Sequence, residues 1–251
     1  PGPIAMVGSQ RSSDRGSSDA SENLIAAVKW AAEGPKPSGE CGDSTVVIMH
    51  TSSHDGTCSV QPGTGVRKMH STRRDAFKMV NGERISEITI SRDGLTHSPV
   101  PKQESREISN PTKYDSDIRI AQFIAGPHLH SDLLDAAIKS GYSAIIIHGT
   151  GLGHLPIENP NGDAPENDKL FKTIESSSIP VIIANQCING PVDLNVYSKG
   201  RNQQQIGVLG HGATSSPEAL LAKVHWALSN GKGLEILKEN LCGENQPTLR
   251  S

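Results

Sequence analysis

The feature that most constrains the fold is a series of short apolar runs that alternate with helical patterns. The runs cover residues 4–7, 45–49, 144–147 and 181–184, and they are rich in Val, Ile and Ala. A helical pattern that starts near Ser21 separates the first two runs. A strand–helix–strand order requires parallel pairing of the two strands. The sequence therefore predicts an α/β fold with a small, doubly wound parallel sheet.

Further elements follow from the same patterns. The first helix is predicted to bury the apolar side chains of Leu24, Ile25, Ala27, Val28 and Ala31, which recur at helical spacing. The expected N-caps are Asp19 or Ser21 for this first helix, Ser131 for a second helix, and Ser215 or Ser216 for a helix that begins at Pro217. The remaining predicted elements are strands at 85–90 (an edge strand), 118–124 and 206–209 and helices at 131–139, 166–176 and 234–240, whereas 50–64 and 195–201 are expected to be loops.

A proline-rich polar segment divides the chain. Pro99, Pro101 and Pro111 lie among polar residues between 96 and 114, a composition typical of an inter-domain connection. We predict a first domain over residues 1–97, a linker over 98–117 and a second domain over 118–251. The chain starts at Pro1 and reaches an apparently buried strand within three residues. We expect it to be a segment of a longer protein.

Composition excludes several classes of protein. The net charge of −3 over 251 residues provides no general attraction for nucleic acid or acidic membranes. The apolar runs are too short to cross a bilayer, and no signal segment opens the chain. The four cysteines are scattered without a C-x-x-C pair, which argues against a zinc site or disulfide framework and fits a reducing cytoplasm.

Two segments are candidates for chemistry. Residues 8–19 form a small, polar and charged loop between the first strand and the first helix, where open α/β sheets bind ligands; the alternative is a solvated connection. Lys68 lies among Arg67, His70, Arg73 and Arg74, and nearby positive charge would lower its pKa and suit it to proton transfer. The alternative is an exposed lysine in a basic loop.

Three other patterns favour structural roles. The glycine-rich stretch between His148 and His154 lacks the G-x-G-x-x-G spacing of a dinucleotide site, so close backbone approach explains it more simply. His128 and His130 could join these two histidines around a metal, but no carboxylate accompanies them, so loop histidines are the better interpretation. Cys187 is interpreted as a small buried thiol rather than a nucleophile.

Taken together, several segments resemble the L-asparaginase-like amidohydrolases along nearly the whole chain. They are residues 7–15 with Ser17-Ser18-Asp19, residues 65–77 around Val-Arg-Lys-Met-His, the Gly-Thr-Gly-Leu-Gly-His of 149–154, Gln186-Cys187, residues 195–201 and Pro217-Glu218-Ala. The exact residues of these motifs, together with Gly243-Glu244 and Arg250-Ser251 near the end of the chain, are most similar to one branch of this family. That branch is formed by the D subunits of archaeal tRNA-dependent amidotransferases. That family implies the remainder of a larger N-terminal α/β domain and a smaller flavodoxin-like domain.

The resemblance also implies an activity and its residues. Lys68 matches the catalytic lysine, Ser9 matches a residue beside the bound amide, and Asp19 matches a structural position. The family's nucleophilic threonine and its Gly-Thr-Asp-Thr motif have no match in this sequence, so the chain by itself is expected to be inactive. His148 stands where this branch has Glu, and residues 212–216 replace an acidic stretch, which leaves fine substrate selection open.

The implied function is amide hydrolysis that releases ammonia for conversion of Glu-tRNA(Gln) into Gln-tRNA(Gln). The substrate would be glutamine or asparagine, and the partners would be the amidotransferase's E-type subunit, a second copy in a homodimer, and tRNA held mainly by the partner subunit. Neither a cofactor nor a metal nor a membrane is expected, and the location would be the cytoplasm. Two alternatives remain: a free cytoplasmic L-asparaginase, and a non-catalytic relic that only binds a partner.

Overall fold

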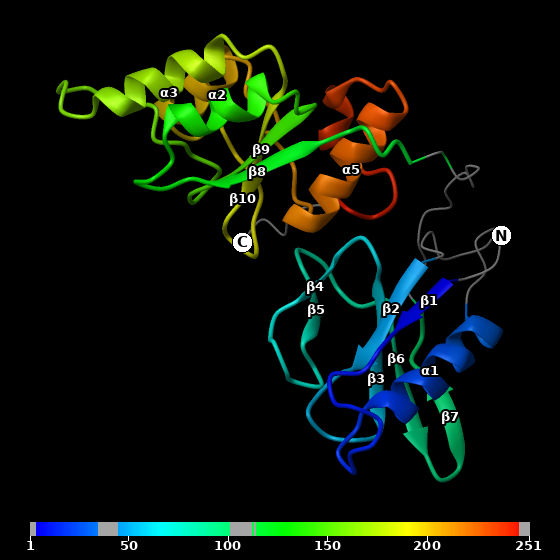
Figure 1. The fold of residues 1–251 in the computed structure, drawn as a ribbon. Helices are drawn as coiled ribbons and strands as arrows, with labels where there is room; N and C mark the ends of the chain where they lie inside the picture. The colour runs from blue at the N-terminus through cyan, green and yellow to red at the C-terminus, as the bar shows by residue number, and fades with distance from the viewer. Residues whose placement is uncertain (1–3, 35–44, 101–111, 113, 246–251) are drawn as a thin grey trace. The chain divides into compact units, whose positions relative to one another are not determined.

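A computed structural model describes residues 4–34, 45–100, 112 and 114–245. The described residues form two compact units, which are treated separately (Figure 1). The first comprises residues up to Val100 together with 241–245, and the second comprises those from Thr112 to Asn240. Most of the predicted linker, residues 101–111 and 113, lies outside the described residues, as does Cys41.

The first unit is built on a five-stranded mixed sheet. Its order is β1-β2-β3-β6-β7, with β1 parallel to β2 and every other pair antiparallel. The strands are β1 (Ile4–Val7), β2 (Thr45–His50), β3 (Thr57–Pro62), β6 (Ser86–Ser91) and β7 (Gly94–His97). The helix α1 (Ala20–Glu33) connects β1 to β2, which confirms the strand–helix–strand unit.

Two strands of this sheet lie where the sequence did not predict them. β3 falls in the segment expected to be a loop, and β7 was not predicted. Because β7 pairs with β6, β7 rather than β6 lies at that edge of the sheet, and the prediction that residues 85–90 form an edge was wrong. In β3 the fully buried Cys58 and Val60 alternate with the polar residues Ser59 and Gln61, so a period-two pattern was present in the sequence.

α1 packs on the sheet through a face that shares only Ala27 with the predicted one. Ala26, Ala27 and Trp30 enter the core with β2 and β3. Leu24, Ile25 and Val28, which the apolar spacing assigned to the core, are 46–60% exposed. β1 is also exposed rather than buried, because it is the end strand and pairs on one side only. Apolar residues therefore occur on both faces of α1, and spacing alone cannot choose between them.

A separate hairpin carries the basic segment of the first unit. β4 (Val66–Lys68) pairs antiparallel with β5 (Phe77–Met79), so that Lys68 lies opposite Phe77. The turn between the two strands is closed by a hydrogen bond from Met69 N to Ala76 O at 2.7 Å. At the other end of the hairpin, Val80 N donates to Gly65 O. The expected basic loop is therefore an ordered two-stranded element.

The second unit is a three-layer α/β structure with the predicted parallel sheet. The sheet has the order β10-β9-β8, formed by Val181–Asn185, Ala144–Gly149 and Ile120–Ile124. Ile145 and Ile147 face the helices α2 (Ser131–Lys139) and α3 (Pro165–Glu175), whereas Ile146 faces α5 (Pro217–Ser229). Figure 1 shows α2 and α3 together on one side of the strands, with α5 on the other.

Smaller differences concern loops and caps in this unit. Residues 198–205 form α4 (Ser198–Gln205) rather than a loop, and 206–209 form only a bridge between Ile182 and Leu209. Residues 234–238 form a 3₁₀ helix, η1 (Leu234–Lys238).

The Ser216 hydroxyl accepts from Ala219 N at 3.2 Å, which confirms that cap. Ser131 is the first helical residue instead of the N-cap, and its N–H and hydroxyl bind Glu166 on α3. Among the described residues, no helix has the length and apolarity needed to cross a membrane.

Candidate functional site

The loop between β1 and α1 is organised by one buried carboxylate. Asp19 is 0% exposed and accepts hydrogen bonds from Gln10 N at 3.0 and 3.1 Å and from Arg11 N at 3.0 Å. Burial alone would raise the pKa of Asp19, but the backbone donors and Asn23 outweigh it and hold this pKa below its usual range. An ionised Asp19 therefore fixes the backbone next to Ser9, which is itself exposed.

Asn23 and His50 connect this loop to the centre of the sheet. Asn23, on α1, donates through Nδ2 to Gly8 O at 2.9 Å and to Asp19 Oδ2 at 3.0 Å. Its Oδ1 lies 2.7 Å from Nδ1 of His50, the last residue of β2. Both side chains are 0% exposed. The β1–α1 loop, the helix α1 and the strand β2 are thus joined by buried polar contacts.

Arg74 brings the hairpin turn into the same network. Its side chain is 6% exposed, its Nη2 lies 2.7 Å from His50 Nε2, and it forms an ion pair with Asp55 at 2.5 Å. Burial, followed by the Arg74 charge, lowers the pKa of His50 below 6.5, with Glu22 opposing. The neighbouring Arg73 has an exposed side chain that pairs with Asp75, so the basic segment contains one buried and one exposed arginine.

Lys68, the predicted catalytic residue, lies at the end of β4. Its side chain is exposed, and its Nζ lies 5.9 Å from the centre of the Phe77 ring. No hydrogen bond joins Lys68 to Ser9 among the described residues. The two are connected indirectly, because the loop of Ser9 and the hairpin of Lys68 share the buried network.

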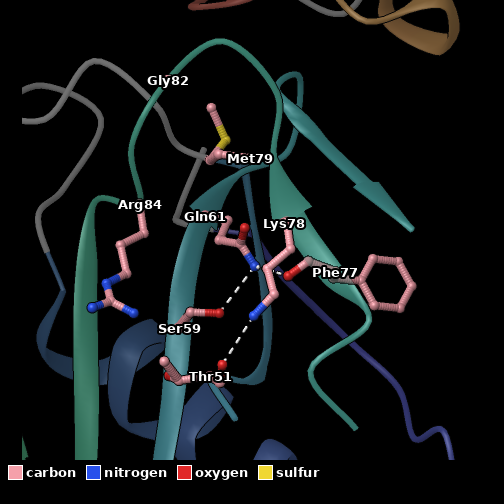
Figure 2. Close-up of a pocket in the computed structure, with 8 residues that line it drawn as sticks. All are labelled: Thr51, Ser59, Gln61, Phe77, Lys78, Met79, Gly82 and Arg84. Atoms are coloured by element: carbon pink, nitrogen blue, oxygen red, sulfur yellow. Dashed lines mark hydrogen bonds between the residues drawn. The ribbon is translucent and has the colours of Figure 1, made fainter. Parts of the chain in front are cut away.

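A pocket of about 220 Å³ lies beside the hairpin. Figure 2 shows the residues that line it. Two of its hydrogen bonds attach β5 to the sheet: Gln61 Nε2 donates to Phe77 O at 2.9 Å, and Lys78 Nζ donates to Thr51 O at 3.0 Å. Gln61 also donates to Ser59 at 2.9 Å. Because Phe77 pairs with Lys68, these contacts fix the strand that faces the candidate lysine.

One group of metal-ligand side chains occurs in the described part of the chain. Atoms of Glu22, His50 and Asp55 lie within 4.8 Å of one another. The Arg74 guanidinium already contacts both His50 and Asp55, and Glu22 Oε2 accepts from Gly56 N at 2.9 Å, so each member of this group already has a partner within the chain. The four histidines considered from the sequence do not belong to it. Neither spacing nor composition identified Asn23, His50 and Arg74 together.

The glycine-rich loop of the second unit has a packing explanation. A side chain on Gly149 would lie 2.5 Å from Gly153 backbone, and one on Gly153 would lie 2.8 Å from Ile183. Gly153 also has a φ of 103°. Close backbone approach thus accounts for these glycines.

The thiol prediction for Cys187 was wrong. Cys187 is exposed in the turn after β10, where Asn185 Oδ1 accepts from its N–H at 2.9 Å. Among the three cysteines that the structure describes, Cys58 is the buried one, and burial raises its pKa to about 12. A short polar turn at the end of a strand places its residues at the surface, which outweighed the tendency of cysteine to be buried.

Comparison with protein families gives two matches that together span most of the chain. Residues 1–99 match the family described as "Asparaginase, N-terminal", and residues 119–241 match "Glutaminase/Asparaginase C-terminal domain". Both assignments agree with the resemblance found in the sequence.

The similar proteins include one kind of amidotransferase subunit. They are the D subunits of glutamyl-tRNA(Gln) amidotransferases: the chain is 37% identical over 98% of its length to that of Metallosphaera sedula, 36% over its full length to that of Archaeoglobus fulgidus and 34% over 99% to that of Pyrococcus abyssi. It spans about half of these relatives, 54–56% of their length. Among solved structures, the thermostable L-asparaginase of Thermococcus kodakarensis matches 99% of this chain and 69% of its own, with a TM-score of 0.74 and 24% identity, which supports the fold.

Proposed function

Because this chain belongs to the asparaginase family of amidohydrolases, we propose that it is part of a glutaminase that supplies ammonia to a tRNA-dependent amidotransferase. The observation that carries the proposal is the 34–37% identity to amidotransferase D subunits over nearly the whole chain. The reaction would be hydrolysis of the glutamine side-chain amide to glutamate and ammonia.

In this proposal Lys68 is the proton-transfer group. By the family resemblance, a threonine oxygen attacks the amide carbon, and its proton passes to the lysine through a Thr-Asp pair. That proton leaves with ammonia, and water then hydrolyses the resulting ester to release glutamate. Lys68 suits this role because it is exposed at the end of a strand whose partner, Phe77, is held by Gln61. Ser9 would lie beside the bound amide.

The proposed setting is an amidotransferase in the cytoplasm. The E-type partner subunit would receive the ammonia and hold most of the tRNA, which agrees with a net charge of only −3 on this chain. A homodimer is proposed from the family resemblance. Glutamine is favoured over asparagine because the relatives with high identity are amidotransferase subunits, whereas the L-asparaginase structure is 24% identical and supports only the fold.

The test is ammonia release by the full-length protein that contains this chain. Glutamine and asparagine are compared as substrates, each with and without the partner subunit and charged Glu-tRNA(Gln). We expect turnover of glutamine that increases when partner and tRNA are present. Preferential asparagine turnover that ignores them would identify a free asparaginase, and no turnover of either amide would favour a binding protein without catalysis.

A further inference from the structure

Buried contacts form one continuous path between the β1–α1 loop and the β4–β5 hairpin. It runs from the backbone N–H groups of Gln10 and Arg11 to Asp19, and then through Asn23 and His50 to Arg74. The four side chains of this path are at most 6% exposed. We call Asp19, Asn23, His50 and Arg74 the relay. Buried polar groups of this kind are expensive to leave unpaired, so neighbouring members constrain one another.

With His50 neutral, the donors and acceptors of the relay fit one arrangement. Both protons of Asn23 Nδ2 face acceptors, Gly8 O and Asp19 Oδ2. Turning the amide over would place its oxygen against those acceptors, so Oδ1 must face His50. His50 Nδ1 therefore donates to Asn23 at 2.7 Å. In the neutral imidazole Nε2 is then an acceptor, and Arg74 Nη2 donates to it at 2.7 Å. Glu22 Oε2 lies 3.0 Å from the same nitrogen and would accept from it only if His50 were protonated on both nitrogens.

Arg74 connects the relay to the backbone of the hairpin that carries Lys68. It lies in the turn of the hairpin, between Met69 and Ala76, whose hydrogen bond directly follows the pairing of Lys68 with Phe77. The β5 strand is held by Gln61 and Lys78, as Figure 2 shows. The hairpin is thus attached to the sheet through β5, and its turn is attached where Arg74 meets His50, Asp55 and Ser53 O.

We propose that Asn23, His50 and Arg74 are positioning residues that couple the Ser9 loop to the Lys68 hairpin and so set the geometry of the amide-hydrolysing site. This inference rests on the proposed function, since it takes Lys68 as the proton-transfer group. None of the three touches the substrate; each acts through the backbone that it holds. Misplacing a catalytic group by about 1 Å can reduce turnover by up to about 100-fold.

The test uses Arg74→Gln in the full-length protein, with Arg73→Gln as the matched control. Both variants remove one arginine charge from the same turn, but the Arg73 side chain is 58% exposed, pairs with Asp75 and lies outside the relay. We expect Arg74→Gln to lower kcat for glutamine about 10- to 100-fold, with a much smaller change in KM, because proton transfer is misaligned. Arg73→Gln should stay within about threefold of the wild type, the scale of a surface ion pair.

A second readout does not depend on activity. Nuclear magnetic resonance should show His50 protonated on Nδ1 and free of a proton on Nε2 in the wild type. Arg74→Gln should shift the amide resonances of Gln10 and Arg11, at the far end of the relay, whereas Arg73→Gln should leave them in place. Where Arg74→Gln does not fold, Arg74→Lys replaces it, because lysine keeps the charge but offers no planar fork.

The outcomes separate this inference from the proposed function. A wild type without glutamine turnover would refute the function, and the resonances would then decide the relay: unshifted Gln10 and Arg11 amides overturn it, and shifted amides support it. With an active wild type, an Arg74→Gln enzyme of unchanged kcat would overturn the positioning role. An equal loss in Arg73→Gln would also overturn it, because the effect would then follow charge in the turn rather than the relay.

Discussion

Asp19 shows how one residue serves both helix and loop. It occupies the N-cap position of α1, where a carboxylate ordinarily accepts from the first helical N–H groups, yet its side chain makes no such cap. It accepts instead from Gln10 and Arg11, nine and eight residues earlier in the chain. Its position was predictable as a cap, but its actual partners required the fold, because they depend on where the loop returns to the helix.

His50 makes the first unit sensitive to acid. Its folded pKa lies below 6.5, through burial first and then Arg74, with Glu22 and Asp19 opposing. Because unfolded histidine binds a proton near 6.5 and folded His50 does not, its contribution to stability is present above about pH 6.5 and is lost as pH falls through the folded pKa. The remaining neighbours are Asn23, Asp55 and Cys58.

Denaturant unfolding of the wild type and His50→Gln at about pH 7.5 and about pH 5.5 measures this effect. The wild type should lose more free energy of unfolding between the two pH values than the variant does. Equal losses in the two proteins would mean that His50 is not buried in its neutral form.

The contacts among the relay residues could not be predicted from the sequence. Lys68 and Ser9 came from motifs that resemble a family, and Arg74 was noted only as a member of a basic run. Asn23, His50 and Arg74 are separated by 27 and 24 positions. Their meeting depends on α1, β2 and the hairpin turn being packed together, and no local pattern encodes that.

At the scale of elements, substitution of Gly153 tests whether close packing explains the glycines of the loop at residues 149–154. Gly153→Ala combines a φ of 103° with a Cβ at 2.8 Å from Ile183 and 2.9 Å from Val192. We expect a loss of about 2–5 kcal/mol in the free energy of unfolding, from backbone strain together with overpacking. Gly151→Ala is the control, because its φ is 54° and no atom lies within 4 Å, so that strain alone costs roughly 1–2 kcal/mol.

Unfolding monitored by circular dichroism compares the two glycine variants. If Gly153→Ala were no more destabilising than Gly151→Ala, tight packing would not explain the loop, and a ligand-binding role would have to be considered again.

The elements themselves were predictable where periodicity was unambiguous. β8, β9 and β10 with α2 and α3 follow strongly apolar runs and well-spaced helices, and they were found near their actual bounds. β3 was missed because its buried Cys58 and Val60 alternate with Ser59 and Gln61, and this short pattern resembles a polar loop. Of the α1 residues predicted to be buried, Ala27 was correct, but Leu24, Ile25 and Val28 are exposed and the core contacts come from Ala26 and Trp30 instead. Apolar residues on both faces of the helix caused this error.

At the scale of the whole molecule, the proposed reaction needs a nucleophile that we place outside these 251 residues. The sequence contains no Gly-Thr-Asp-Thr motif to pair with Lys68. We therefore expect the 251-residue chain, purified alone, to release no ammonia from glutamine or asparagine above a buffer control. An ammonia assay with both amides checks this expectation. Turnover that persists after repurification would show that the nucleophile lies within this chain and that the proposed division of roles is wrong.

The most direct test of the central claim is Lys68→Met in the full-length protein. Methionine keeps an unbranched apolar side chain beside Phe77 but removes the amine that transfers the proton. Lys29→Met, at a surface pair with Glu33, is the control. We predict that Lys68→Met lowers kcat for glutamine by about 100- to 10,000-fold, with unchanged thermal unfolding, while the control stays near the wild type. A Lys68→Met enzyme that retains near-normal turnover would contradict the account.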